Sequence, residues 1–184
     1  MQRYRALSGG ILSTSKTVID DNASLNVRWE DLPKSVQTQY PQEDVRQPPR
    51  VIFDRQSQLS DDLKLFNTDG ERIIVSQGGD MVPELGENGQ IDLAATLRNV
   101  ASGYHINHLW VEAGATLASS LIKANLVDEL IVYLAPKLMG SDGRGLIGAL
   151  GLTEMAQVID LTITDVRMVG VDIRITATVK RNQS

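Results

Sequence analysis

The segment from Trp110 to Ser120 places an apolar run, a carboxylate and a glycine next to one another. Residues 109–111 predict a short buried strand, and residues 114–116 predict the start of a helix. The apolar face of that helix would contain Leu117, Leu121 and Leu126. The first N–H groups of a helix lack internal partners and carry the positive end of its dipole, so small residues here favour binding of a phosphate. The spacing lacks the full G-x-G-x-x-G pattern, so an ordinary helix start is the alternative.

Other residue types narrow the chemistry. His105 and His108 flank a predicted turn and have no obvious third ligand, so we expect ordinary polar roles and no metal site. The chain contains no cysteine, which excludes a thiol nucleophile and a thiolate zinc site. Ser119 and Ser120 have no evident base nearby, so helix packing is favoured over nucleophilic catalysis. No residue is therefore assigned as a catalytic nucleophile.

Length and charge indicate a single globular domain whose partners are small molecules. A chain of 184 residues with 42% hydrophobic content fits one domain with a sizeable core. The net charge of −5, without a basic cluster, argues against nucleic-acid or anionic-membrane partners. The apolar runs are shorter than the ~20 residues of a bilayer span, and no signal-peptide core follows Met1. We therefore expect a cytoplasmic protein.

The first half of the chain predicts alternating strands and helices. Residues 2–7 resemble the end of a helix that begins before Met1, and strands are expected at 10–13, 51–53 and 73–75. Residues 14–17 should open a short helix. Helical spacing over 91–100 predicts a core-facing helix with Asp92 and Arg98 at its two ends. Four prolines in 30–50 predict a long loop with at most one short helix.

The second half predicts a strand at 130–134, a glycine-rich loop at 136–145 and a hairpin with its turn at Gly170. The loop would border a ligand or a subunit interface, or serve only as a connection. The apolar residues of the hairpin alternate, which places them on one face. The fold class is therefore α/β, with a mixed, mostly parallel central sheet that is flanked by helices and ends in an antiparallel hairpin.

Five blocks of sequence carry a family resemblance. They are R-A-L-S-G-G-I-L-S-T-S-K-T-V at 5–18, L-N-V-R-W at 25–29, W-V-E-A-G-A-T-L-A at 110–118, V-D-E-L at 127–130 and A-P-K-L-M-G at 135–140. In order and spacing they resemble the reductase domain of bifunctional riboflavin biosynthesis proteins along the whole chain. The resemblance implies a dihydrofolate-reductase-like domain over 1–184, assembly as a homodimer and NADPH as cofactor. It also implies reduction of 5-amino-6-(5-phosphoribosylamino)uracil to its ribityl product.

The resemblance also assigns residues. Matching positions imply that the substrate contacts Arg5, Leu25, Arg28 and Glu112. They imply that the cofactor contacts Thr17, Asp21, Gly114, Ala115, Thr116, Leu117, Ala118, Ser119 and Ser120. Without the resemblance, exposed arginines, a core leucine and capping residues would explain most of these positions equally well.

Several departures from the family pattern leave an alternative open. The family's first strand, with a lysine and an S-L-D-G-type turn, is not in this sequence, which predicts an exposed sheet edge. The zinc deaminase domain is not in it either. Asn22 stands where the family often has proline, and Arg55 follows Asp54 where serine is common. The alternative is a folded, non-catalytic fragment that keeps the oligomerisation surface; a pterin or folate reductase is a weaker reading, because Glu112 and the two arginines favour a sugar phosphate.

Overall fold

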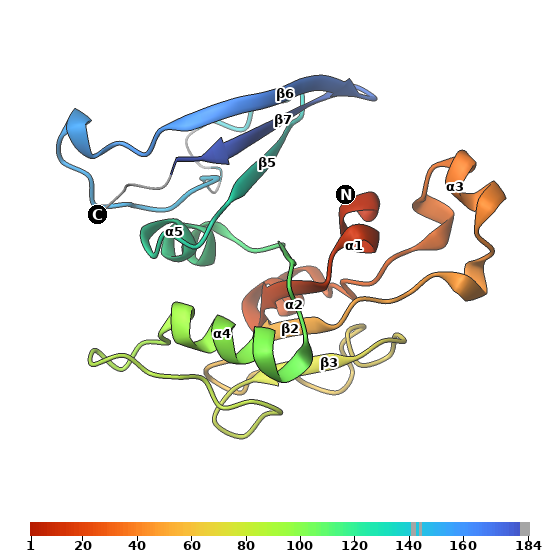
Figure 1. The fold of residues 1–184 in the computed structure, drawn as a ribbon, viewed down its shortest axis with the longest axis horizontal. Coiled ribbons are helices and arrows are strands. Elements are labelled where there is room, and N and C mark those ends of the chain that lie inside the picture. The colour runs from red at the N-terminus through yellow and green to blue at the C-terminus, as the bar shows by residue number, and fades with distance from the viewer. Residues whose placement is uncertain (141–142, 144, 181–184) are drawn as a thin grey trace. The chain divides into compact units, whose positions relative to one another are not determined.

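The computed structural model describes residues 1–140, 143 and 145–180. The chain divides into two compact units, Met1–Ala113 and Gly114–Ser184. Each unit contains its own hydrogen-bonded sheet (Figure 1). Residues 141, 142 and 144 of the expected glycine-rich loop lie outside the described residues.

The first unit is built on a four-stranded parallel sheet. Its strands are β1 (Gly10–Thr14), β2 (Arg50–Phe53), β3 (Arg72–Val75) and β4 (Leu109–Val111), in the order β3-β2-β1-β4. All three strand pairs are parallel. The predicted strands are confirmed, because short β-branched runs suit strands that are covered on both faces. All four residues of β2 are buried, as are the first four of β1.

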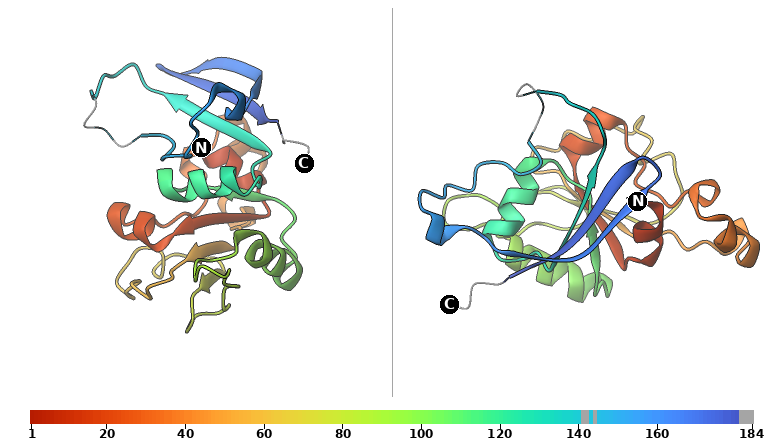
Figure 2. Two further views of the ribbon diagram at one scale, coloured as in Figure 1. Left: turned by 90° about the vertical axis from the view of Figure 1, so that its left-hand side faces the viewer. Right: turned by 90° about the horizontal axis from the view of Figure 1, so that it is seen from above.

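The helices of this unit follow most of the local signals. They are α1 (Gln2–Leu7), α2 (Ser15–Asp21), α3 (Lys34–Gln39) and α4 (Leu93–Tyr104). The proline-rich segment contains one α-helix, α3, as expected, and two 3-10 turns, η1 (Trp29–Asp31) and η2 (Gln42–Asp44). The Thr14 hydroxyl accepts a hydrogen bond from Thr17 N, which caps α2. Figures 1 and 2 show α4 beside the four-stranded sheet.

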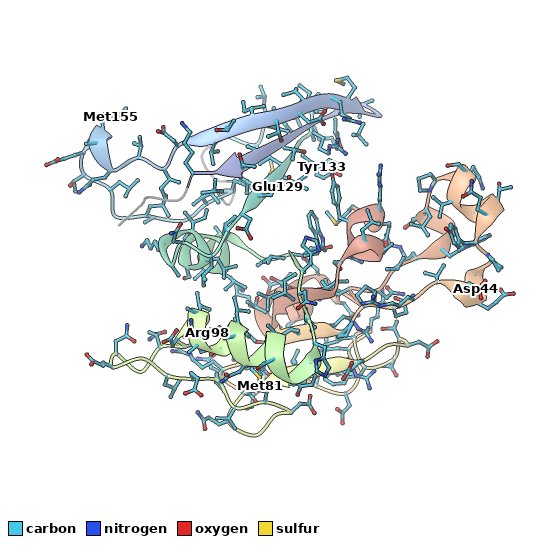
Figure 3. The ribbon with its side chains drawn as sticks, in the orientation of Figure 1. Asp44, Met81, Arg98, Glu129, Tyr133 and Met155 are labelled. Atoms are coloured by element: carbon cyan, nitrogen blue, oxygen red, sulfur yellow. The ribbon has the colours of Figure 1, made fainter. Side chains whose placement is uncertain are left out.

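The end of α4 corrects one prediction. Asp92 caps the first turn as expected, because its carboxylate accepts a hydrogen bond from Ala95 N. The helix continues to Tyr104 and stops only at His105, whose φ of 54° is left-handed. Arg98 therefore lies in the middle of α4 (Figure 3) and does not favour the dipole at its end. The segment 101–104 contains no proline, and its single glycine, Gly103, does not end the helix.

The core of the first unit lies between the sheet and its flanking segments. The buried cluster consists of Ile11, Val18, Leu25, Ile52, Leu63 and Leu65. Its residues come from β1, α2, β2 and two loops, so the loop segments 22–27 and 59–68 are fixed by side chains that pack into the core. Residues of these two loop segments also line a cavity.

The second unit contains α5 (Ala115–Lys123) and an antiparallel sheet. Its strands are β5 (Glu129–Leu134), β6 (Leu161–Val169) and β7 (Asp172–Val179), in the order β5-β7-β6, with the 3-10 turn η3 (Met155–Gln157) before β6. Figure 2 shows the three strands side by side. The turn between β6 and β7 contains Gly170, whose φ is 65°. The predicted hairpin is confirmed, since glycine adopts this conformation without a steric penalty.

A bulge keeps one face of this sheet apolar. The register shifts between Ile163 and Asp165, so Val166 and Met168 continue the face that Leu161 and Ile163 begin. Their partners on β7 are Ile175 and Ile173, and these pair in turn with Val132 and Leu134 on β5. Side chains of directly paired residues share a face. The alternation expected for the hairpin therefore holds along β7, whereas on β6 it is interrupted after Ile163.

The sheets also differ from the expected single mixed sheet. The parallel and antiparallel strands form two separate hydrogen-bonded sheets, because β5 pairs with β7 and β4 pairs with β1. Among the described strands, β3 and β4 lie at the edges of the parallel sheet, and β5 and β6 lie at the edges of the antiparallel sheet.

None of the helices in the described part of the chain is long and apolar enough to cross a membrane. The same residues contain no group of three or more His, Cys, Asp or Glu side chains arranged to hold a metal ion.

Candidate functional site

Arg5 and Glu112 form a bidentate ion pair. Arg5 Nε donates to Glu112 Oε1 at 2.7 Å, and Arg5 Nη2 donates to Oε2 at 2.6 Å. Arg5 Nη1 also donates to the Asn26 carbonyl at 2.8 Å. The two side chains are only 8% and 14% exposed, so the charges stabilise each other in a largely dry environment. Two of the five N–H donors of Arg5 remain for a ligand.

The strands and α1 hold Glu112 in place. Glu112 directly follows β4, where its backbone N–H donates to Leu12 O at 2.9 Å and its carbonyl accepts from Ser13 Oγ at 2.6 Å. Trp110 Nε1 donates to Oε1 at 2.7 Å, and the Trp110 ring stacks on Tyr4 with centroids 4.8 Å apart. Oε1 thus accepts two hydrogen bonds and Oε2 one, which leaves acceptor capacity on Oε2.

Several predicted residues line one cavity in the first unit. The cavity has a volume of about 270 Å³. Its lining includes the predicted residues Arg5, Asp21, Leu25 and Arg28, together with Asn22, Ala23, Ser24 and Lys64. The family resemblance assigned Asp21 to the cofactor and the other three to the substrate, whereas the structure brings all four to one place. Thr17 does not line this cavity.

The backbone around Leu25 is unusual. Leu25 has a φ of 54° and is only 2% exposed, so its side chain belongs to the core while its backbone is left-handed. Such a conformation is rare for a bulky residue. Arg50 donates to the Ser24 carbonyl and Arg5 to the Asn26 carbonyl, so both neighbours of Leu25 are braced. The N–H groups of residues 24–26 donate to no acceptor among the described residues.

Arg28 and Thr17 already have partners. Arg28 Nε donates to Asp31 Oδ2 at 2.5 Å, and the two side chains are 49% and 44% exposed. An exposed pair of this kind contributes little, so Arg28 can exchange partners at low cost. Thr17 takes part in the N-terminal cap of α2. Its backbone N–H donates to the Thr14 hydroxyl, and its own hydroxyl lies 3.2 Å from that of Thr14. Asp21 is the last residue of α2, is exposed and lines the cavity.

The predicted cofactor segment forms the first two turns of α5 in the second unit. Gly114 precedes the helix, and the N–H groups of residues 115–117 have no acceptor within the described part of the chain. A Cβ added to Gly114 would meet no heavy atom within 4 Å. The side of Gly114 on which a side chain would stand is therefore open, and the N–H groups that follow have the character of an anion-binding helix start.

The two serines of α5 bond to the helix itself. Ser119 Oγ donates to Ala115 O at 2.6 Å and accepts from Gly148 N at 2.7 Å, while Ser120 Oγ donates to Thr116 O at 3.0 Å. Ser119 is buried, as is Leu117. These contacts agree with the packing role expected for the serines. Leu126, expected on the apolar face of the helix, lies beyond its end at Lys123.

Sequence reasoning missed two cations near the cavity. Lys64 lines it directly. Arg50 is 1% exposed and donates to four carbonyls in the segment 65–70, to the carbonyl of Ser24 and to the hydroxyl of Thr68. Burial, followed by the nearby charge of Arg72, lowers the pKa of Arg50 to about 10. The spacing of residues in the sequence does not predict that Lys64 or Arg50 lies near the cavity, because both positions depend on how the loops fold.

A larger cavity of about 580 Å³ lies along β3, and its lining includes Asp54, Phe66, Arg72 and Ser76. None of the predicted substrate or cofactor residues lines it. We therefore take the smaller cavity as the candidate substrate site, because the predicted residues line it and a larger volume does not by itself indicate a binding site.

The chain is similar to known proteins along almost its whole length. Residues 1–175 match the family described as RibD C-terminal domain. The chain is 42% identical to the riboflavin biosynthesis protein RibD of Haemophilus influenzae, over 98% of the chain and 50% of that protein. It is 30% identical to a protein of Buchnera aphidicola named 5-amino-6-(5-phosphoribosylamino)uracil reductase, over 98% of the chain and 91% of that protein. The chain thus spans about half the length of the Haemophilus relative.

A solved structure shows the same fold. The structure of Acinetobacter baumannii RibD matches with a TM-score of 0.81 and 30% identity, over 97% of this chain and 49% of that one. The dihydrofolate-reductase-like α/β fold implied by the sequence is thereby confirmed. Taken with the match over residues 1–175, this establishes that the chain belongs to the RibD C-terminal domain family.

Proposed function

We propose that this chain reduces 5-amino-6-(5-phosphoribosylamino)uracil to 5-amino-6-(5-phosphoribitylamino)uracil in riboflavin biosynthesis, with NADPH as cofactor. The observation that carries the proposal is the cavity in which Arg5 on α1 meets Leu25 and Arg28 from the loop before η1. The Buchnera relative, which the chain covers almost completely, is named for this reductase activity. A cytoplasmic location goes with the proposal, since a cysteine-free chain needs no oxidising compartment.

The reaction requires positioning more than a nucleophile. When the ribose ring opens, C1 of the sugar is doubly bonded to the exocyclic nitrogen. The cofactor, when bound, supplies the hydride that C1 accepts, and a proton adds to the nitrogen to give the ribityl amine. No covalent bond to the protein forms. The hydroxyls of Ser119 and Ser120 donate to carbonyls of their own helix, which is compatible with a reaction that needs no serine nucleophile.

The substrate phosphate is the natural ligand of the cavity. Arg28 can exchange Asp31 for a phosphate, because the exposed ion pair is weak and a guanidinium binds phosphate through parallel hydrogen bonds. Ser24 and Leu25 line the cavity, and their N–H groups, which have no acceptor among the described residues, would donate to the same anion. Leu25 thus acts through its backbone, while its side chain fixes the loop in the core.

Arg5 and Glu112 form the other part of the proposed substrate site. The remaining capacity of Oε2 suits a ribose hydroxyl, and the spare N–H donors of Arg5 suit a phosphate or ring oxygen. Because each side chain is already held by the other, little rotamer entropy is lost when the substrate binds. The ion pair therefore preorganises both groups.

The start of α5 fits the phosphates of NADPH. The unpartnered N–H groups of Ala115, Thr116 and Leu117 and the open space at Gly114 would hold them. Ala118, Ser119 and Ser120 would act by maintaining the helix. Thr17 and Asp21 would hold hydroxyl or amide groups of the cofactor, in addition to capping and ending α2.

Assembly as a homodimer is also part of the proposal. On the apolar face of the β5-β7-β6 sheet, Ile163, Val166 and Met168 are 62%, 58% and 61% exposed. An apolar sheet face of this kind is typical of protein interfaces. A two-fold axis would pair the face with its own copy.

Turnover and binding test these assignments together. We expect the purified chain to oxidise NADPH only with the phosphorylated substrate, and Arg28→Ala to raise KM about tenfold with little change in kcat. Thr38→Ala on α3, an exposed substitution outside the cavity, is the control. Equal kinetics of Arg28→Ala and the control would refute the proposed substrate site.

A further inference from the structure

The cations that line the 270 Å³ cavity differ in how they are paired. Arg5 is bound to Glu112, and Arg28 is bound to Asp31. Lys64 forms no ion pair with any carboxylate of the described residues, and its ammonium donates no hydrogen bond to them. Lys64 is thus the lining cation whose charge the described chain leaves uncompensated.

The position of Lys64 is fixed by the fold although its side chain is exposed. Its backbone N–H donates to Asn22 Oδ1 at 2.9 Å, which ties it to the opposite wall of the cavity. Its neighbours Leu63 and Leu65 are both buried in the core cluster. Arg50 bonds to the carbonyls of Leu65 and Ser24, so it ties the same two walls together a second time. The backbone of Lys64 therefore stays at the cavity.

Asn22 is suited to this contact by its own conformation. Its φ of 43° is left-handed, which asparagine tolerates and proline cannot adopt. The side-chain oxygen that binds Lys64 N is absent from proline as well. The departure at Asn22 thus coincides with a contact that places a lysine at the cavity.

We propose that Lys64 is a substrate-binding residue that contacts the phosphate group of the ligand in this cavity. The proposal rests on the proposed function, because it takes the phosphorylated substrate as the ligand. The charge of Arg28 is already paired with Asp31 through Nε, whereas Lys64 has no carboxylate partner among the described residues. An ammonium on a flexible stem can also follow a phosphate that Arg28 and the N–H groups of residues 24–25 hold.

The test is a comparison of substrates that differ only in the phosphate. For Lys64→Met we expect kcat/KM to fall about tenfold with the phosphorylated substrate and to stay unchanged with the dephosphorylated one. Lys64→Arg should restore most of the loss because it keeps the charge. Lys34→Met on α3 is the matched control, since Lys34 is also exposed and does not line the cavity.

The outcomes separate this inference from the proposed function. An equal fall with both substrates would show that Lys64 only maintains the cavity wall, and no fall with either would show that it does not contact the phosphate. Both results overturn the inference while the unmodified chain remains active. If the folded, unmodified chain turns over neither substrate, the proposed function fails and the inference fails with it. A urea unfolding curve for each variant establishes that the fold is intact.

Discussion

Arg5 and Glu112 are 107 residues apart in the sequence and share two hydrogen bonds, of 2.7 and 2.6 Å. The pair joins α1 to the end of β4, and the third guanidinium contact, to Asn26 O, reaches the segment that lines the cavity. The ion pair therefore connects the stability of the first unit to the geometry of the proposed substrate site.

Removal of one partner of this pair should be costly. Glu112→Ala leaves a mostly buried guanidinium without its counter-ion, so we expect a loss of about 3 kcal/mol in the free energy of unfolding. Glu112→Gln retains the shape and one acceptor and should lose less. Urea unfolding measures both values. Glu30→Ala, at an exposed position on η1, is the control, and equal losses for Glu112→Ala and Glu30→Ala would contradict the buried pair.

The serines of α5 should affect stability and not turnover. Ser119→Ala removes the acceptor of Gly148 N and a donor to Ala115 O, so we expect a loss of about 1 kcal/mol with kcat unchanged. Ser120→Ala removes only a bond to the Thr116 carbonyl and should cost less. Thermal unfolding and steady-state kinetics measure the two effects. A large fall in kcat for Ser119→Ala, with stability unchanged, would instead indicate direct participation.

Substitution of Gly148 tests the contact between Gly148 and Ser119 in a second way. A Cβ there would lie 2.9 Å from Ser119 Oγ and 3.4 Å from Ala115 O, so Gly148→Ala should destabilise the chain. In the double variant with Ser119→Ala the closest clash disappears. We therefore expect the two losses in unfolding free energy to sum to more than the loss of the double variant.

Asp165 should make the stability of the second unit depend on acid pH. Arg167 and Arg174 face each other across β6 and β7, and their hydrogen bonds to Asp165 lower the pKa of its carboxyl from 3.8 to about 2. A carboxyl with a lowered folded pKa stabilises the fold above its unfolded pKa, and the contribution disappears as the pH falls through the folded value.

Asp165→Asn should therefore lower the unfolding temperature near neutral pH and reduce the further loss between pH 3.8 and about 2. Thermal unfolding as a function of pH measures this, with Asp160→Asn, an exposed position just before β6, as the control. A pH profile of Asp165→Asn parallel to that of the unmodified chain would exclude this role of the carboxyl.

The apolar face of the antiparallel sheet should control assembly. Val166→Lys places a charge in the middle of that face, so we expect it to convert the proposed dimer into a monomer in sedimentation equilibrium. Thr162→Lys on the same strand points to the opposite face and should leave the dimer unchanged. A dimer that persists in Val166→Lys, or is lost equally in both variants, would place the interface elsewhere.

Local sequence signals predicted most elements because each depends on nearby residues. The β-branched runs of β2 and β3, the Thr14 cap and Gly170 all act within a few positions, and the structure has them where the sequence predicted them. Local signals failed at the C-terminal end of α4, where nothing before His105 stops the helix. They failed also at the bulge near Thr164, because a bulge depends on the partner strand.

The candidate site was predictable only through the family resemblance. Spacing alone does not indicate that Arg5 lies beside Glu112, or that Lys64 faces Asn22, because these contacts join distant segments. The division of the strands into two sheets has the same origin, since strand partners are chosen by the tertiary fold. In the sequence, Arg50 falls at the end of the predicted proline-rich loop, and only the fold shows that it begins β2 and organises the loops around the cavity.

The most direct test of the central claim is formation of the ribityl product. The purified chain is incubated with NADPH and freshly prepared 5-amino-6-(5-phosphoribosylamino)uracil, and both NADPH oxidation and the mass of the product are followed. We expect equal amounts of oxidised cofactor and ribityl product, with both signals lost when either reactant is omitted. A folded chain that forms no ribityl product at saturating concentrations of both reactants would contradict the reductase function.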